Sequence, residues 1–208
     1  MTDCLWGATD GMNEDGLAIS LTFGGAAAVG EGFGIPLIIR YILEFCSNVD
    51  EAAAVFSRVP THMAYNVTML DKSGRFLTAF ISPNNPPAIR PVPVATNHQG
   101  MDRYQPRHIE TQTVEREQLL NHCFADGNMD EDKILNLFMH PPLYTNRYAN
   151  GFGTVFTSHY RPATGEVYYY WPNDMWDCSF STFVDSSRLV NFTPWGAVME
   201  KGLMPAVK

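Results

Sequence analysis

The sequence predicts an α+β protein in which helices and antiparallel strands pack as layers. The expected elements follow the order strand, helices, hairpin, strand, helices, hairpin, which differs from the strict strand–helix alternation of a parallel sheet. Two pairs of β-rich runs are each joined by a short turn that contains glycine, as in β-hairpins. Hydrophobic residues make up 45% and charged residues 17% of the 208 residues, which is a globular composition. Without a visible linker or repeat, we expect one domain over residues 1–208.

The N-terminal part predicts a strand, a loop and two helices. Residues 16–23 are apolar and partly β-branched, which favours a strand, and the glycine-rich residues 24–34 favour a loop. Pro36 suits the first turn of a helix, because its missing N–H is not needed there. The apolar spacing predicts one buried helix face made of Leu37, Ile38, Tyr41, Ile42 and Phe45. Asn48 with Glu51 three residues later predicts the start of a second helix.

The middle of the chain predicts a hairpin, a loop and a further strand. Residues 65–70 and 76–81 are β-rich and flank a D-x-x-G turn, which indicates a hairpin. Residues 83–93 contain proline at a density that disfavours sheet pairing, so we expect a surface loop. Residues 92–96 favour a strand that ends at Asn97.

The C-terminal half predicts two more helices and a second hairpin. Residues 110–124 and 130–139 have helical patterns, and residues 154–160 and 166–171 flank a turn. Residues 180–184 favour one more strand.

Charge and residue spacing exclude several classes of function. The net charge is −8, and the chain has no Lys/Arg cluster, which argues against nucleic acid and anionic membrane surfaces as partners. The apolar residues 35–46 are too few to span a bilayer. Neither the four cysteines nor the six histidines have metal-binding spacing, so we expect no metal or cofactor. The low cysteine content and the lack of a secretion signal favour the cytoplasm, with free and mostly buried thiols.

Three polar segments stand out against this scaffold. Residues 10–16 (DGMNEDG) are typical of a tight turn before a strand. Asn97 at a strand end suits either strand termination or hydrogen-bond donation to a developing oxyanion. Thr113 favours a helix N-cap, and Arg116 in the same turn favours a solvated charge. The residue types alone leave these alternatives open.

Taken in order, these segments resemble one enzyme family. The resemblance is carried by DGMNEDGLAISLTF, GIPLIIRYILEFCSNVDEAAAVF, NVTMLDKSGRF, VATNH, TVER and TVFTSHYRPATGEVYYYWPN. They resemble the choloylglycine hydrolase, acid-amidase and isopenicillin N acyltransferase-like group of N-terminal nucleophile (Ntn) hydrolases, over residues 10–173. The resemblance implies a four-layer αββα sandwich with two antiparallel sheets between helices. It also implies hydrolysis or acyl transfer at the linear amide C–N bond of a small molecule.

The resemblance also implies roles for three site residues. In this family an N-terminal cysteine is the nucleophile, and its own α-amino group is the base. The asparagine that holds the tetrahedral oxyanion matches Asn97. The second oxyanion donor, a backbone N–H, falls on Thr22, and the arginine of the T-x-x-R helix start matches Arg116, which would order the site electrostatically.

The chain departs from the family at the nucleophile. In the family the nucleophilic cysteine lies well before the DGMNE motif, so Cys4 does not match it. We therefore expect a sandwich that is incomplete at its N-terminus and supplies the oxyanion half of the site. The nucleophile would come from an N-terminal segment or a second chain, and this chain alone would be inactive. The alternative is a non-catalytic remnant that serves as a binding or assembly module. Open sheet edges predict an oligomer in either case.

Overall fold

The computed structural model of the chain describes residues 1–3, 5–100, 110–190 and 192. Its internal contacts divide the chain into two compact units. Unit 1 comprises Met1–Asp126 and Tyr160–Gly165, and unit 2 comprises Gly127–His159 and Glu166–Lys208. The prediction about Cys4 lies outside the described residues. A single domain over the whole chain stays a prediction.

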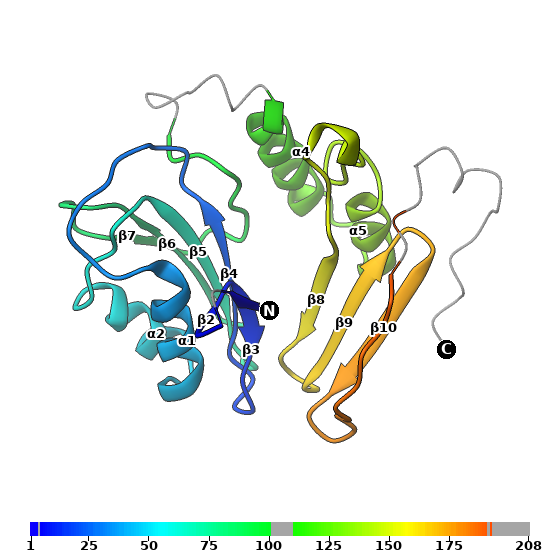
Figure 1. Cartoon of the computed structure of the whole chain (residues 1–208), viewed down its shortest axis with the longest axis horizontal. Coiled ribbons are helices and arrows are strands. Elements are labelled where there is room, and N and C mark those ends of the chain that lie inside the picture. The colour runs from blue at the N-terminus through cyan, green and yellow to red at the C-terminus, as the bar shows by residue number, and fades with distance from the viewer. Residues whose placement is uncertain (4, 101–109, 191, 193–208) are drawn as a thin grey trace. The chain divides into compact units, whose positions relative to one another are not determined.

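Unit 1 is built on a five-stranded antiparallel sheet with the strand order β3-β4-β5-β6-β7 (Figure 1). Its strands are Asp10–Met12 (β3), Ala18–Phe23 (β4), Tyr65–Leu70 (β5), Phe76–Ile81 (β6) and Ala88–Arg90 (β7). A small hairpin of Thr2–Asp3 (β1) and Gly7–Ala8 (β2) precedes it. The β5–β6 hairpin has the predicted bounds, because its alternating runs and its turn are both local in sequence.

The proline-rich segment contains an edge strand that its proline content does not predict. Residues 83–93 were expected to form only a loop, but Ala88–Arg90 pair with β6. The strand lies between Pro87 and Pro91 and contains no proline itself. As the last strand in the sheet order, it pairs on one side only, so prolines next to it remove no hydrogen bond from a sheet interior.

The polar segment 10–16 forms β3 and the turn into β4. The side chain of Asn13 accepts the N–H of Leu17 at 2.9 Å within this turn. Its Nδ2 donates to the carbonyl of Cys46 at 2.7 Å and to that of Leu43 at 3.1 Å. The turn interpretation is confirmed, and Asn13 also ties the C-terminal end of the following helix to the sheet.

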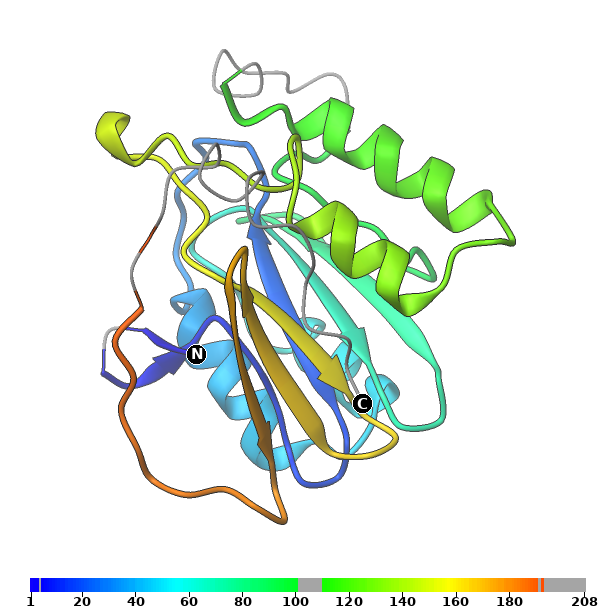
Figure 2. The same cartoon turned by 90° about the vertical axis from the view of Figure 1, so that its right-hand side faces the viewer.

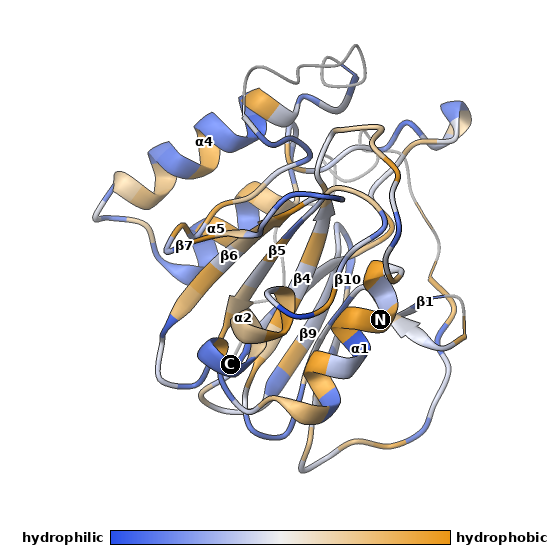
Figure 3. Ribbon diagram, turned by 90° about the vertical axis from the view of Figure 1, so that its left-hand side faces the viewer, coloured by the Kyte–Doolittle hydropathy of each residue, from blue (hydrophilic) through white to orange (hydrophobic). Residues whose placement is uncertain are grey.

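Two helices, α1 (Ile35–Phe45) and α2 (Val49–Phe56), cover one face of this sheet, as Figure 3 shows. Pro36 lies in the first turn of α1, and Asn48 caps α2 by accepting the N–H of Glu51 at 3.0 Å, so both predicted starts are confirmed. The helices and the sheet enclose one apolar core. Its largest fully buried members are Leu17, Ile19, Ile35, Ile39, Ile42, Val49, Val55, Val67 and Met69.

The predicted buried face of α1 is wrong in part. Ile38 and Ile42 are buried as expected, together with Ile35 and Ile39. The other members of the predicted face, Leu37, Tyr41 and Phe45, are exposed. Apolar residues occupy two faces of this helix, so helical spacing alone cannot choose the face that meets the sheet.

The rest of unit 1 includes α4 (Thr113–Ala125), and unit 2 contains α5 (Glu131–Phe138) and a short 3₁₀ helix, η2 (Tyr148–Asn150). An antiparallel sheet has the order β10-β9-β8, with strands Thr157–Arg161 (β8), Glu166–Trp171 (β9) and Asp174–Ser179 (β10) (Figure 2). Strand β8 begins in unit 2 and ends in unit 1. None of the described helices has both the length and the apolar character that a membrane crossing requires.

The second predicted hairpin is confirmed as β8 and β9, but the last predicted strand is wrong. Residues 180–184 form no strand, and Phe180, Phe183 and Val184 are exposed. Asp174–Ser179 pairs with β9 instead, after a turn at Pro172-Asn173. The prediction followed apolar content, whereas the pairing follows the short turn that leads directly out of β9.

Candidate functional site

Asn97 and Arg116 are in direct contact, although they belong to different segments of unit 1. Asn97 lies in the loop after β7, and Arg116 lies in α4. The Arg116 Nη2 donates to the Asn97 Oδ1 at 2.6 Å. Because the carbonyl oxygen of the amide is turned to the guanidinium, its Nδ2 points elsewhere as a hydrogen-bond donor.

Arg116 is partly buried, and this burial lowers its pKa from the ordinary value. A guanidinium nevertheless remains charged at physiological pH. Its Nε is buried and has no hydrogen-bond partner among the residues that the structure describes. The Arg116–Asn97 pair therefore places a fixed positive charge and an oriented amide at one position.

Thr22 joins the same site through its hydroxyl. The Oγ1 of Thr22, near the end of β4, donates to the carbonyl of Thr96 at 3.2 Å. Thr22 therefore holds the residue before Asn97, and Arg116 holds Asn97 itself. The structure brings the three residues named from the sequence into one neighbourhood, while their catalytic roles stay predictions.

The pairing of β4 with β5 shows that the backbone N–H of Thr22 points toward β5. Gly24, two residues further, donates its N–H to the carbonyl of Ala64, just before β5, at 2.9 Å. N–H groups of alternate residues in a strand point to the same side, so that of Thr22 points into the β4–β5 ladder. Leu21 donates on the opposite side, to the carbonyl that precedes β3, at 3.1 Å. The N–H of Phe23 shares that direction.

The predicted strand at residues 92–96 is not formed, because side chains of the sheet bind its backbone instead. Asn66 of β5 is fully buried, and its Nδ2 donates to the carbonyls of Thr96 at 2.7 Å and His98 at 2.9 Å. Gln99 fixes the next residue of the loop, since its Nε2 donates to two carbonyls at the ends of β5 and β6, both at 3.0 Å. These bonds fix the loop on both sides of Asn97.

His98 connects this loop to α4 through both ring nitrogens. Its ring is buried, with Nδ1 3.0 Å from the Thr113 hydroxyl and Nε2 3.2 Å from a carboxylate oxygen of Glu117. The Thr96 hydroxyl donates to the carbonyl of Thr113 at 2.9 Å. The predicted N-cap role of Thr113 is wrong, because Gln112 precedes α4 in a left-handed conformation and Thr113 is its first, fully buried residue.

Sequence reasoning missed the residues that support Asn97. Asparagine and glutamine occur mostly on protein surfaces and histidine is intermediate, so the burial of Asn66 and His98 and the contacts of Gln99 are not visible in the sequence. The one available signal is the polar run T-N-H-Q directly after an apolar segment, in which only Asn97 matches a family motif.

The described cysteines are free thiols, and two of them, Cys46 and Cys123, are buried. Burial, with a further contribution from Glu51, raises the pKa of Cys46, and burial also raises the pKa of Cys178. A raised pKa disfavours the thiolate that attacks a carbonyl. Within the described part of the chain, no group of three His, Cys, Asp or Glu side chains is arranged to hold a metal ion.

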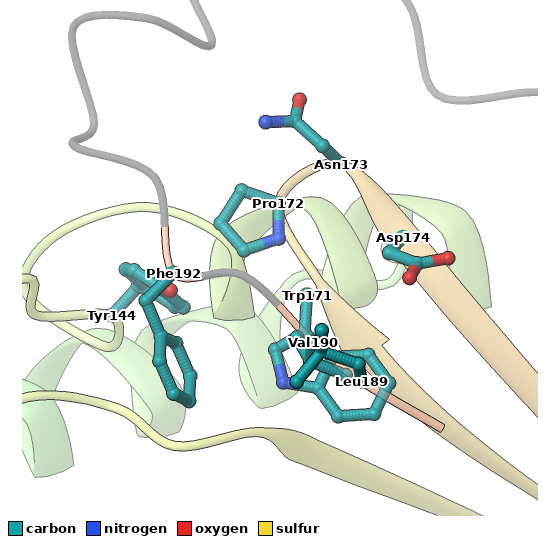
Figure 4. Close-up of a pocket in the computed structure, with 8 residues that line it drawn as sticks. All are labelled: Tyr144, Trp171, Pro172, Asn173, Asp174, Leu189, Val190 and Phe192. Atoms are coloured by element: carbon teal, nitrogen blue, oxygen red, sulfur yellow. The ribbon is translucent and has the colours of Figure 1, made fainter. Parts of the chain in front are cut away.

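A separate small pocket of about 190 Å³ lies within unit 2 (Figure 4). Trp171, Tyr144 and Phe192 supply aromatic walls. Its polar groups are engaged: Trp171 Nε1 donates to the carbonyl of Val155 at 2.7 Å, the Tyr144 hydroxyl lies 2.9 Å from that of Tyr148, and Asp174 pairs with Arg188. Burial raises the pKa of Tyr144, so this phenol stays protonated. None of the three predicted site residues lines the pocket.

One solved structure shows the fold. The chain is similar to a mutant of the conjugated bile acid hydrolase from Clostridium perfringens, with a TM-score of 0.61 and 11% sequence identity. The match covers 84% of this chain and 73% of that chain. It confirms the predicted α+β fold class, that of the Ntn-hydrolase αββα sandwich. A comparison with curated proteins found no match.

The sequence profile of the acyl-coenzyme A:6-aminopenicillanic acid acyl-transferase family matches residues 1–176. This match covers the helices, the site residues and the strands β1 to β9 described above, and it ends within β10. It lies within the wider group that the sequence motifs predicted, so the predicted family is confirmed. The chain therefore belongs to the acyl-coenzyme A:6-aminopenicillanic acid acyl-transferase family.

Proposed function

We propose that this chain takes part in hydrolysis or acyl transfer at the linear amide bond of a small molecule, and that Asn97 stabilises the oxyanion of the tetrahedral intermediate. The observation that carries the proposal is the 2.6 Å hydrogen bond from Arg116 to the Asn97 Oδ1. It sets the orientation of the amide, so that Nδ2 is the atom offered to a substrate. A preorganised donor of this kind needs no rearrangement when negative charge develops.

The proposed chemistry uses a cysteine and its own α-amino group. The amino group accepts the thiol proton as sulfur attacks the amide carbonyl, and the carbonyl oxygen becomes the oxyanion. Collapse of this intermediate breaks the C–N bond, and the ammonium returns the proton to the leaving nitrogen. Water or an acceptor amine then takes the acyl group from sulfur. The cysteine is proposed to come from an N-terminal segment or a second chain.

The second oxyanion donor is proposed to be a backbone N–H at the end of β4. The sequence motif assigned it to Thr22, whose N–H points toward β5. Phe23 is the better placed of the two, because its N–H points to the other side of the strand. Thr22 would then serve the site through its hydroxyl, which holds the carbonyl of Thr96 at 3.2 Å.

The family supports a small-molecule substrate that carries or accepts an acyl group. The related proteins are named for conjugated bile acids and for acyl-coenzyme A with 6-aminopenicillanic acid. We propose a substrate of this general kind, with no cofactor. The cytoplasmic location proposed from the sequence rests on the low cysteine content.

Asn97→Ala tests the oxyanion role in the protein expressed from its complete reading frame. We expect kcat on a reactive linear amide to fall about 10²–10³-fold with little change in KM, because one transition-state donor is lost. Asn97→Asp should be at least as damaging, since its carboxylate would repel the developing charge.

Steady-state kinetics measures this effect, and thermal unfolding of each variant checks that the fold persists. Asn85→Ala is the matched control, because Asn85 is an exposed asparagine whose hydrogen bonds stay within its own loop. Unchanged kcat in folded Asn97→Ala would remove Asn97 from the mechanism.

The alternative function is a non-catalytic binding or assembly module. It is compatible with the raised pKa values of Cys46 and Cys178, because neither thiol has an activating environment. The same complete protein separates the two functions. A panel of linear amides that includes acyl-amino acid conjugates, penicillins and acyl-ethanolamines should be turned over by the enzyme and left intact by the module.

A further inference from the structure

The outer face of α1 carries an apolar stripe that the described residues of unit 1 leave exposed. Leu37, Tyr41 and Phe45 follow one another at intervals of four residues, which places them in one row along the helix. Their exposed fractions are 49%, 42% and 68%. The rings of Tyr41 and Phe45 already contact each other, with centroids 4.9 Å apart. The opposite face of α1 packs into the apolar core of unit 1.

One side of this stripe carries a pair of opposite charges. Arg40 and Glu44 precede Tyr41 and Phe45 by one residue each, so they form a second row next to the apolar one. The two side chains form an ion pair along the helix, and both are about half exposed. The other side of the stripe borders the buried residues Ile38 and Ile42. The stripe therefore has a charged edge on one side only.

From this arrangement we infer that α1 is a dimer interface, on which the stripe of a second copy of this chain packs in an antiparallel orientation. A two-fold axis perpendicular to both helices, passing near Tyr41, sets Leu37 of each copy against Phe45 of the other. The same axis keeps both charged edges on one side of the interface. It also reverses the order of the charges, so Arg40 of one copy faces Glu44 of the other, twice.

The positions of the charges favour a second copy of this chain as the partner, and they favour the antiparallel orientation. Parallel packing would set the charged edge of one helix beside the Ile38 side of the other, where α1 itself carries no charged residue. The antiparallel pair is self-complementary in both its apolar row and its charges, as an interface between identical chains requires. Apolar cores with charged rims are the usual composition of such interfaces. The inference concerns assembly and does not depend on the chemistry proposed above.

The experiment is sedimentation velocity of the whole chain over a range of concentrations. The wild type is expected to dimerise, and Leu37→Glu and Tyr41→Glu are each expected to raise the dimer dissociation constant by at least about 100-fold, because each substitution occurs twice per interface. Phe183→Glu is the control, since Phe183 is equally apolar and exposed but lies in unit 2. It should leave the dissociation constant unchanged.

A charge exchange tests the orientation. Arg40→Glu alone sets two like charges opposite each other and should weaken the dimer. The double variant Arg40→Glu/Glu44→Arg restores opposite charges only in the antiparallel dimer and should recover the wild-type dissociation constant. A monomeric wild type, a dimer that Tyr41→Glu does not weaken, or a double variant no better than Arg40→Glu would each overturn the inference. Circular dichroism spectra confirm that every variant is folded.

Discussion

His98 shows how a residue outside the proposed chemistry can set the geometry of the site. The His98 Nδ1 lies 3.1 Å from the Thr96 hydroxyl and 3.0 Å from the Thr113 hydroxyl, and its Nε2 lies 3.2 Å from a carboxylate oxygen of Glu117. The Thr96 hydroxyl in turn donates to the carbonyl of Thr113. The buried imidazole thus links the Asn97 loop to the helix that carries Arg116.

A buried carboxylate in the hairpin turn gives a pH-dependent test at the residue scale. Burial alone would raise the pKa of Asp71, but hydrogen bonds from the Ser73 hydroxyl and from backbone N–H groups, including that of Val49, lower it overall. Because the folded pKa lies below the unfolded value of about 3.9, the stabilisation is present above that pH and is lost as pH falls through the folded pKa. Urea unfolding of Asp71→Asn should show a weaker dependence on pH in this acidic range than the wild type.

The control for this prediction is Asp50→Asn. Asp50 pairs with Arg75 at 2.6 Å, but both side chains are more than half exposed, so the pair contributes little to stability. Asp50→Asn should therefore lose stability at acidic pH to the same extent as the wild type. Equal pH profiles for wild type and Asp71→Asn would contradict the role given to the turn.

At the scale of elements, the connection between the β3–β4 turn and the C-terminal end of α1 depends on Asn13. Its amide donates to the carbonyls of Cys46 and Leu43 at the end of α1 and accepts the N–H of Leu17. Asn13→Ala leaves these backbone groups without a partner, which should lower the free energy of unfolding by about 2–3 kcal/mol. Urea denaturation measures this change in the free energy of unfolding, with Asn85→Ala again as the surface control. A change as small as that of the control would show that water replaces the Asn13 amide.

Elements whose information is local could be predicted from the sequence, and elements chosen by their surroundings could not. The β5–β6 hairpin matched because its turn and its alternation lie within one short segment. The buried face of α1 could not be predicted in the same way. Two faces of this helix are apolar, and only the packed structure shows which of them contacts the sheet. The family motif located Asn97, whereas the supporting bonds from Asn66 and His98 span about thirty residues or bridge two elements.

At the scale of the whole molecule, burial is distributed unevenly between the two units. The apolar core of unit 1 joins both N-terminal helices to the strands β4–β6, and many of its members are fully buried. The corresponding cluster of described residues in unit 2 is built on Leu135, Met139 and Tyr170. Cooperative protection follows buried apolar contacts, so the units should differ in local stability.

Native-state hydrogen exchange should therefore separate the two units. We expect amides of β5 and β6 to exchange at least about 100-fold more slowly than those of β9 and β10, because local opening needs less free energy where few apolar contacts must break. Leu135→Ala should accelerate exchange in unit 2 and leave β5 and β6 unchanged. Val67→Ala, at a fully buried position of β5, should accelerate exchange in unit 1. Mass spectrometry of peptic fragments reads both units at once. Slow exchange at equal rates in β5 and β9, or a response of both units to Leu135→Ala, would show that the chain unfolds as one cooperative unit.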